Sequence, residues 1–451
     1  KITKKGKGLL MERQIYAQLI DWKEKKDRKP LILKGARQVG KTYILKEFSR
    51  QNFKNVHYLN FEEDELLNRI FERDLKPGRI IQEISFHLDS SIDFDHDILI
   101  MDEIQHCPKA LTSLKYFNES MPRFAICSAG SLLGIRLAPS SFPVGKVEYL
   151  EMFPMCFKEF LKACREEKIL NYLAAMDYAL PLPDIIHIKL WDLFKIYLIV
   201  GGMPEVINTF RSTQKDLYTT LQEVRKKQKD LIQTFLADIA KYSGKINSMH
   251  IERILTNIPS QLAREQDGSA SKFKFRGVVP GVSGYSRLAG AMDWLVATGL
   301  IHKVHIAMRA ELPFAAFIKE NRFKLFMFDV GLLNAMADLP AKAILEYSFG
   351  TYKGYIAENF VAQELICKGL GPLFSWQENK SEIEFIIESE GRILPVEVKS
   401  GWVTQAKSLK VFAEKYHPEF RTIMSAKNLT IDPANKVHNY PVYLASHFPV
   451  Y

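Results

Sequence analysis

Residues 31–45 constrain the fold of this chain more than any other stretch. An apolar run, Leu31–Leu33, precedes a loop bounded by Gly35 and Gly40, and a helix is expected to begin near Lys41. The spacing G-x-x-x-x-G-K-[ST] between a strand and a helix is that of a phosphate-binding loop, whose amide groups and helix N-terminus attract a polyphosphate. The sequence therefore predicts a parallel α/β core that binds a nucleotide.

Each position of this loop is a candidate contact with ATP. Lys41 is expected to reach the β- and γ-phosphates, and the Thr42 hydroxyl is expected to bind Mg²⁺. A chance glycine-rich turn before a helix is the alternative interpretation. The predicted nucleotide-binding residues are Gly35, Ala36, Arg37, Gln38, Val39, Gly40, Lys41, Thr42 and Tyr43.

A second apolar run, residues 97–101, ends in the carboxylates of Asp102 and Glu103. Parallel strands carry their functional residues at their carboxyl ends. We expect Asp102 to hold Mg²⁺. Glu103 should point the other way and accept a proton from the water that attacks the γ-phosphate, or orient that water. An acidic strand end without function is the alternative.

Two further positions near the nucleotide are less specific. The strand expected at residues 123–131 ends in small polar residues, so Ser131, or second to it Ser128, is a candidate to contact the γ-phosphate or the attacking water. Arg13 lies in an N-terminal helix beside the loop. It is expected to be a solvated helix arginine, with contact to adenine or phosphate as the alternative.

These motifs resemble those of a large prokaryotic family of predicted AAA-type ATPases (AAA+ superfamily), whose C-terminal half is a conserved domain of uncertain function. The resemblance covers nearly the whole chain and implies a P-loop NTPase core. It rests on residues 35–42, Asp102-Glu-Ile-Gln105, Ala129-Gly-Ser131, Phe153-Pro-Met-Cys-Phe-Lys-Glu-Phe160, Tyr197-Leu-Ile-Val-Gly-Gly-Met-Pro204 and Phe323-Lys-Leu-Phe-Met-Phe-Asp-Val-Gly331.

One departure from the family concerns the arginine that completes such sites in a neighbouring subunit. Family members carry a Gly-Arg pair before the Phe-Pro motif, whereas this chain has Gly145 and Lys146. A lysine cannot make the bidentate contact of an arginine. Arg136 is a weak substitute, and an oligomer is expected only as a family property.

Four parts are expected along the chain. Residues 1–165 would hold the N-terminal helix and the AAA-type core, and residues 166–245 a helical lid. Residues 246–310 follow the order helix, helix, helix and strand, with helices expected at about 248–256, 260–265 and 286–298. This order suggests a winged helix used for docking or for DNA. Residues 311–451 would form a small α/β domain with the element order α-β-β-β-α-β and a hairpin through Ser389-Glu-Gly391.

That last domain is expected to have the fold of the PD-(D/E)XK nucleases. Glu397 and Lys399 share one face of a strand because they are two residues apart. With Glu358 and Glu384 they match the residues that hold Mg²⁺ and stabilise phosphodiester attack in such enzymes. Glu384 stands where the motif normally has aspartate, and a surface strand of alternating charges is the alternative interpretation.

Composition limits the partners. The 451 residues carry 62 Lys and Arg against 52 Asp and Glu, a net charge of +10. With the basic segment Lys272–Arg276, this favours weak, non-specific DNA binding, although lysines spread over solvated helices give the same total. Five cysteines without C-x-x-C spacing, no apolar run of membrane length and no signal peptide favour the cytoplasm.

The sequence thus predicts a Mg²⁺-dependent ATPase whose cycle rearranges C-terminal modules that contact DNA or a protein. The alternative is a binding protein that ATP orders without hydrolysis and whose nuclease-like domain is inactive.

Overall fold

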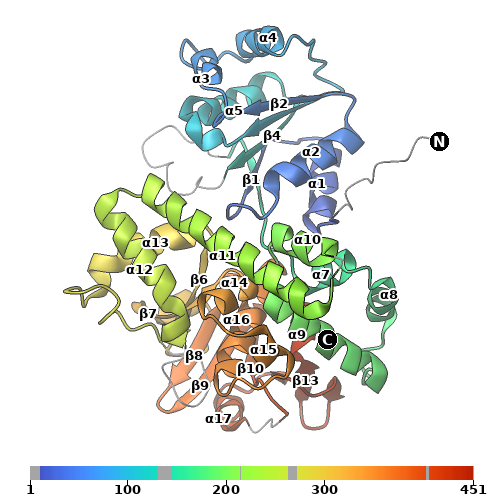
Figure 1. Ribbon diagram of the computed structural model, residues 1–451, viewed down its shortest axis with the longest axis vertical. Coiled ribbons are helices and arrows are strands. Elements are labelled where there is room, and N and C mark those ends of the chain that lie inside the picture. The colour runs from blue at the N-terminus through green and yellow to red at the C-terminus, as the bar shows by residue number, and fades with distance from the viewer. Residues whose placement is uncertain (1–10, 131–144, 214, 263–271, 403–405, 450–451) are drawn as a thin grey trace. The chain divides into compact units, whose positions relative to one another are not determined.

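The computed structural model describes residues 11–130, 145–213, 215–262, 272–402 and 406–449 (Figure 1). The chain forms two compact units, Lys1–Phe153 with Ala297–Gly299 and Pro154–Val296 with Leu300–Tyr451. Among the helices of the described ranges, none has the length and apolar character needed to cross a membrane. The finer division into four domains stays a prediction.

A five-stranded parallel sheet forms the centre of the first unit, in the order β2-β3-β4-β1-β5. β3 and β4 are buried along their whole length, as expected for apolar strands covered on both faces. The parallel core expected from the sequence is therefore confirmed. Its strands are β1 (Leu31–Lys34), β2 (Val56–Asn60), β3 (Ile98–Asp102), β4 (Ala125–Gly130) and β5 (Glu148–Glu151).

Helices and apolar side chains cover this sheet. α1 and α2 lie side by side (Figure 1), and Trp22 of α1 packs beside Phe48 of α2 with ring centroids 6.3 Å apart. A second apolar cluster joins β2, β3 and β4 to α3, α4 and α5. The helices are α1 (Ile15–Glu24), α2 (Lys41–Asn52), α3 (Leu66–Ile70), α4 (Pro77–His87), the 3-10 turn η1 (Ile104–His106) and α5 (Pro108–Ser120).

The second unit begins with a helical stretch, as the sequence predicts for the segment after the core. Further helices lie between and after its strands. They are α7 (Phe157–Ala163), α8 (Glu167–Ala175), α9 (Asp184–Val200), α10 (Pro204–Ser212), α11 (Leu217–Tyr242), α12 (Lys245–Leu262), α13 (Tyr285–Ala297), η2 (Phe314–Phe317), α14 (Val330–Met336), α15 (Ala341–Leu345), α16 (Tyr352–Cys367), α17 (Lys407–Tyr416) and η3 (Val442–His447).

An eight-stranded mixed sheet completes this unit, in the order β12-β13-β11-β10-β9-β8-β6-β7. β6 and β8, β10 and β11, and β11 and β13 pair in parallel, while the other neighbours pair antiparallel. The strands are β6 (Ile301–Ala307), β7 (Ile318–Met327), β8 (Phe374–Glu378), β9 (Ser381–Ser389), β10 (Arg392–Val398), β11 (Arg421–Ser425), β12 (Thr430–Asp432) and β13 (Val437–Pro441).

The order α16, β8, β9, β10, α17, β11 confirms the α-β-β-β-α-β succession expected for the end of the chain. Glu390 and Gly391 both have positive φ, 53° and 78°. Two such residues form the turn that best matches the twist of a hairpin, so they join β9 to β10 as the sequence indicated. This succession does not by itself establish a nuclease fold.

The segment expected to be a winged helix differs from that expectation. The helix expected at residues 248–256 and the described part, residues 260–262, of the helix expected at 260–265 belong to one helix, α12, with Pro259 inside it. A proline removes one helical hydrogen bond, but Ile254, Leu255 and Ile258 are buried and keep the helix packed through this turn. The following strand, β6, pairs with β7 and β8 and belongs to the large sheet.

Contacts between the sequence motifs shared with the family hold the helices of the second unit together. Asp329 accepts hydrogen bonds from the amides of Gly202, at 2.6 Å, and Leu332, at 2.9 Å. A Cβ atom on Gly202 would lie 2.2 Å from the carbonyl oxygen of Met155, so this position admits only glycine without a backbone shift. The Gly-Gly-Met-Pro and Phe-Asp-Val-Gly motifs therefore have a packing role.

Candidate active site

The phosphate-binding loop connects the end of β1 to the start of α2 and depends on its two glycines. Gly35 has φ +156°, and a Cβ atom there would lie 2.2 Å from the carbonyl oxygen of Met152. Gly40 has φ +97° and precedes the first residue of α2. Both positions use conformations or space that other residues lack. Within the loop Ala36 and Val39 are buried, and Gln38 is exposed with φ +64°.

Lys41 lies at the start of α2 with only 7% of its surface exposed. Its Nζ donates hydrogen bonds to the carbonyl oxygens of Gly35, at 2.9 Å, and Ala36, at 2.7 Å. Burial lowers the pKa of Lys41 to about 8, although the carboxylates of Glu103 and Asp102 oppose this shift. The amine is thus held against the loop that is expected to bind phosphate.

Thr42 and Asp102 are in direct contact. The Thr42 Oγ1 atom donates a 2.7 Å hydrogen bond to Oδ2 of Asp102, which is 3% exposed at the end of β3. Mg²⁺ prefers oxygen ligands such as carboxylates, and a serine or threonine hydroxyl and an aspartate hold it in P-loop enzymes. This hydroxyl and this carboxylate therefore fit that ion, and they are the two residues expected to hold it.

Tyr58 belongs to the same site and was not predicted. Its hydroxyl donates a 2.8 Å hydrogen bond to the same Oδ2 atom of Asp102. It lies on β2, which pairs with β3, and the Lys46 amine lies 3.5 Å from the centre of its ring. Its position two residues before the end of β2, the strand beside β3, could have indicated that it lies near Asp102. That position alone says nothing about which type of side chain it carries, so the sequence did not single out Tyr58.

Glu103 lies next to Asp102 but does not continue the strand. It has φ +49°, so the backbone turns there and η1 follows. Its direction is therefore set by this turn and not by the strand alternation expected from the sequence. The Gln105 side-chain amide donates to Glu103 Oε2. Ligand atoms of Glu103, Glu62 and His106 lie within 4.8 Å of one another, the one such group in the described residues.

Arg13 is a correction to the expected solvated arginine. It is 7% exposed, and its guanidinium donates to the carbonyl oxygens of Val39, at 2.7 Å, and Phe153, at 2.6 Å. Arg13 therefore ties the phosphate-binding loop to the segment that follows β5. An arginine in an amphipathic helix carries no local signal for such distant carbonyl partners.

The remaining predicted residues are placed as follows. Ser131 and Arg136 lie outside the described residues, and Ser128 is buried in β4. Lys146, at the position of the family's arginine, pairs with Glu119 at 3.1 Å. Tyr43 is 47% exposed on α2, and Arg37 lies 3.6 Å from Glu62.

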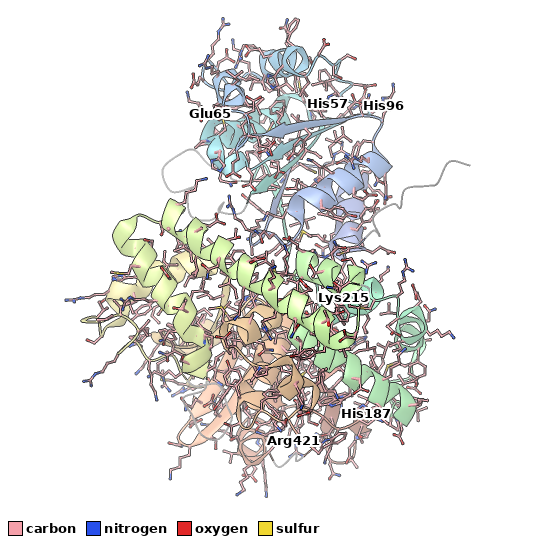
Figure 2. All side chains as sticks on the ribbon, viewed as in Figure 1. His57, Glu65, His96, His187, Lys215 and Arg421 are labelled. Atoms are coloured by element: carbon pink, nitrogen blue, oxygen red, sulfur yellow. The ribbon has the colours of Figure 1, made fainter. Side chains whose placement is uncertain are left out.

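A buried histidine and aspartate pair lies at the amino ends of the strands, opposite to the ends that carry the phosphate-binding loop and Asp102. His57 on β2 (Figure 2) lies with Nε2 2.9 Å from Asp97 Oδ2, just before β3 begins. Hydrogen bonds from His57, Asp93 and Asn55 hold the pKa of Asp97 below its usual value despite burial. Because Asp97 precedes β3 and Asp102 ends it, this pair is separate from the phosphate site.

The second unit holds the other predicted residues. Glu358 on α16, Glu384 on β9 and Glu397 on β10 are 2%, 4% and 3% exposed. Lys399 lies 2.6 Å from Glu397 Oε1, and the Val398 amide donates to Glu384 Oε2 at 3.1 Å. Burial, together with the charges of Glu397 and Glu358, raises the pKa of Glu384 well above its usual range.

Sequence reasoning missed two members of this cluster. Lys324 on β7 is fully buried and lies 2.5 Å from Glu382 Oε1 and 3.4 Å from Glu358 Oε2. The only feature of the sequence that could have identified Lys324 is that it is the single charged residue in the apolar run of residues 323–328. The structure thus gathers the four predicted residues, and adds Lys324 and Glu382, in one ionic cluster in which Glu382 and Lys399 are partly exposed.

Three stretches of the chain match known protein families. Residues 27–161 match a family described as an AAA domain. Residues 192–343 and 353–443 match two domains of unknown function, DUF8612 and DUF4143. The phosphate-binding loop, Asp102 and Glu103 all lie inside the stretch that matches the AAA domain.

Several solved structures are similar to this chain at low identity. The Walker-type ATPase PABY2304 of Pyrococcus abyssi is 15% identical over 73% of this chain and 96% of that chain, with a TM-score of 0.46. The Orc1 protein of Aeropyrum pernix, solved in complex with DNA, is 14% identical over 74% and 92%, with a TM-score of 0.31. Cdc6p from Pyrobaculum aerophilum is 14% identical over 74% of this chain and 92% of that chain, with a TM-score of 0.27. No curated protein matches the sequence.

The lowered pKa of Lys41 predicts a pH dependence of ATP binding. Phosphates pair with the charged amine of Lys41, whose pKa is about 8. At a pH above this value the amine is mostly neutral, so ATP binding must be accompanied by uptake of a proton. The Kd for ATP should show no dependence on Lys41 below that pH and should rise by up to about tenfold per pH unit above it. Titration calorimetry with saturating Mg²⁺, from neutral pH upward, measures this slope.

The matched control is Lys41→Arg, because a guanidinium stays charged throughout this range. Its affinity should be weaker but lack the alkaline slope. A wild-type Kd that stays constant at alkaline pH, or the same slope in both proteins, would contradict this account of Lys41.

Proposed function

We propose that the first unit binds ATP together with Mg²⁺ and hydrolyses the bond to its γ-phosphate. The observation that carries this proposal is the 2.7 Å hydrogen bond between Thr42 and Asp102. It joins the start of α2 to the end of β3, so the hydroxyl and the carboxylate that hold Mg²⁺ in P-loop enzymes already face the same point. When bound, Mg²⁺ neutralises charge on the β- and γ-phosphates.

The loop and Lys41 supply the phosphate contacts in this proposal. The amides between Gly35 and Thr42 and the N-terminal end of α2 offer donors and a favourable field. Lys41 exchanges the carbonyl oxygens of Gly35 and Ala36 for phosphate oxygens, which are charged acceptors and bind an ammonium more strongly. The phosphate charge also raises the pKa of Lys41 again.

Glu103 acts on water. Its carboxylate is a hydrogen-bond acceptor beside the Mg²⁺ residues, and the Gln105 amide orients it from one side. It accepts a proton from the attacking water or orients that water. Tyr58 is a positioning residue that acts through Asp102. Contact of Ser131 with the γ-phosphate remains part of the proposal.

The nucleotide cycle would change the arrangement of the modules that follow the core, which contact DNA or a protein. The competing function is a protein that ATP orders without being cleaved. The Glu103 carboxylate favours hydrolysis, because a site that only binds ATP has no use for an oriented acceptor beside the γ-phosphate.

Two substitutions separate binding from hydrolysis. Lys41→Ala should abolish ATP binding, while Glu103→Gln should bind ATP and release phosphate at least about 100-fold more slowly than the wild type, the lower range for loss of a general base. Phosphate release under steady-state conditions, with and without DNA, measures the turnover. Glu72→Gln, which removes an exposed carboxylate of the same unit, is the matched control and should be unchanged.

If wild-type protein binds MgATP but releases phosphate no faster than Glu103→Gln, the hydrolysis proposal fails and the non-hydrolysing alternative stands.

A second candidate function is cleavage of DNA by the cluster of the second unit. The observation that favours it is at Glu397: its Oε2 atom is buried and makes no hydrogen bond in the described part of the chain, beside the Lys399 amine. A carboxylate oxygen left open next to a lysine is suited to hold a cation at a phosphodiester. The succession from α16 to β11 supports a fold of PD-(D/E)XK type for this domain.

The segment Lys272–Arg276 supports DNA as the polyanion. Phe273 is buried against Phe323, while Lys272, Lys274 and Arg276 are exposed. Aromatic anchoring thus holds three cations outward, which favours weak, sequence-independent and salt-sensitive contact with phosphates.

Cleavage predicts metal-dependent nicking of branched, single-stranded or duplex DNA. Glu397→Ala and Lys399→Ala should each remove it, because Glu397 carries the open carboxylate oxygen and the Lys399 amine pairs with the same carboxylate. Gel analysis with Mg²⁺ or Mn²⁺ measures the nicking. Glu388→Ala, which removes an exposed carboxylate of β9, the strand beside β10, should leave it intact.

Equal nicking in every preparation would identify a contaminant, and absence of nicking in the wild type would make this domain a docking module.

A further inference from the structure

Lys324 is an unusual residue to find in the middle of β7. The strand is buried from Phe323 to Met327, and Lys324 itself is 0% exposed. Removing an ammonium from water is costly unless charged partners compensate for the lost hydration. A fully buried lysine must therefore be explained by the groups around its Nζ atom.

Two carboxylates from different elements provide that compensation. Glu382 Oε1 on β9 lies 2.5 Å from Lys324 Nζ, and Glu358 Oε2 on α16 lies 3.4 Å away. Although burial opposes it, the charges of Glu358, Glu382 and Glu384 raise the pKa of Lys324 above its usual value. The two carboxylates therefore stabilise the positive charge of the buried ammonium.

Arg322 extends the network of contacts around Lys324 and Glu382. Arg322 shares the face of Lys324 on β7 and donates to Gln377 at 2.7 Å. Gln377 in turn donates to Glu382 at 3.4 Å. Gln377 thus contacts Oε2 of Glu382 while Lys324 contacts Oε1, so both oxygens of this carboxylate have a partner.

The two lysines divide the cluster. Lys324, Glu358 and Glu382 form what we term the Lys324 half. Glu384, Glu397 and Lys399 form the Lys399 half, in which Glu397 Oε2 is the open oxygen.

A single divalent ion needs several carboxylate oxygens around one point. The oxygens of Glu358, Glu384 and Glu397, all described residues, do not come within 4.8 Å of one another as a group. Glu358 is instead engaged by Lys324, and α16, which carries it, packs against both β7 and β10. As arranged, the three predicted carboxylates do not fit one shared ion.

We propose that Lys324 is a built-in cation that takes the place of a divalent metal ion between Glu358 and Glu382 and thereby lowers the affinity of the whole cluster for such an ion. The ammonium neutralises the two carboxylates and repels a second cation nearby. This inference is independent of ATP hydrolysis and of DNA cleavage, and it holds for a docking module as well as for an enzyme.

Replacement of Lys324 by methionine tests the proposal, because methionine is uncharged and unbranched and has a similar length. Mn²⁺ is the probe, and the electron paramagnetic resonance signal of free Mn²⁺ reports binding without nucleotide. Both proteins carry Glu103→Gln to disrupt the Glu62–Glu103–His106 group. Lys324→Met should bind Mn²⁺ about tenfold tighter or more, as expected when a like charge a few ångströms away is removed.

Thermal stability gives a second readout. The melting temperature of Lys324→Met should rise with Mn²⁺ and fall in chelator, while that of the protein with Lys324 should respond little. Lys319→Met, on the exposed part of β7, is the matched control and should leave Mn²⁺ affinity unchanged. Equal Mn²⁺ affinity with and without Lys324, or tighter binding with it, would overturn the proposal.

A double variant covers the case in which Lys324→Met alone does not fold. Lys324→Met with Glu358→Gln removes both charges of the buried pair, so it should fold without metal and bind Mn²⁺ as weakly as the protein with Lys324. Tight Mn²⁺ binding by this double variant would also overturn the proposal, because it would place the ion away from Glu358.

Discussion

The hydrogen bond between Thr42 and Asp102 is the interaction on which the first unit depends for its chemistry. The sheet order places β4 between β1 and β3, so the loop after β1 reaches Asp102 only across the end of an intervening strand. This requires the three strands to end at the same level. The parallel register, which pairs Lys34 with Gly130 and Met101 with Ser128, meets that requirement.

Buried polar contacts then hold the loop in the shape that this geometry needs. Arg13 fixes Val39 and Phe153, and the close approach of Gly35 to Met152 fixes the start of the loop against the segment after β5. Tyr58 fixes Asp102 from the neighbouring strand. The hydrogen-bond donors of the site are thus oriented in advance, which lowers the cost of organising them around a polyphosphate.

The sequence was sufficient where the structure depends on local patterns. The apolar runs ending at Lys34 and Asp102, the glycines of the loop and the hairpin at Glu390 and Gly391 specify their own conformations, and these predictions were confirmed. The grouping of Glu358 and Glu384 with Glu397 was expected from the PD-(D/E)XK motif, and strand alternation accounted only for the shared face of Glu397 and Lys399. Their chemical roles stay predictions.

Other features depend on contacts between distant residues and could not be predicted. Arg13 is paired with Phe153 across 140 positions, and nothing near Arg13 in the sequence marks those partners. Glu103 leaves the strand through a left-handed turn that a non-glycine residue seldom adopts. Packing of α12 overrode the break expected near Pro259. The buried charge of Lys324 requires Glu358 and Glu382, which are supplied by elements far along the chain.

A structure of the Glu103→Gln protein with bound ATP and Mg²⁺ tests the central claim most directly. The account predicts a γ-phosphate oxygen about 3 Å from Lys41 Nζ, within hydrogen-bond distance, and the metal ion on Thr42 Oγ1 beside Asp102. Lys41 would then have left the carbonyl oxygens of Gly35 and Ala36. A triphosphate bound away from the loop, or Lys41 still hydrogen-bonded to those two carbonyls, would contradict it.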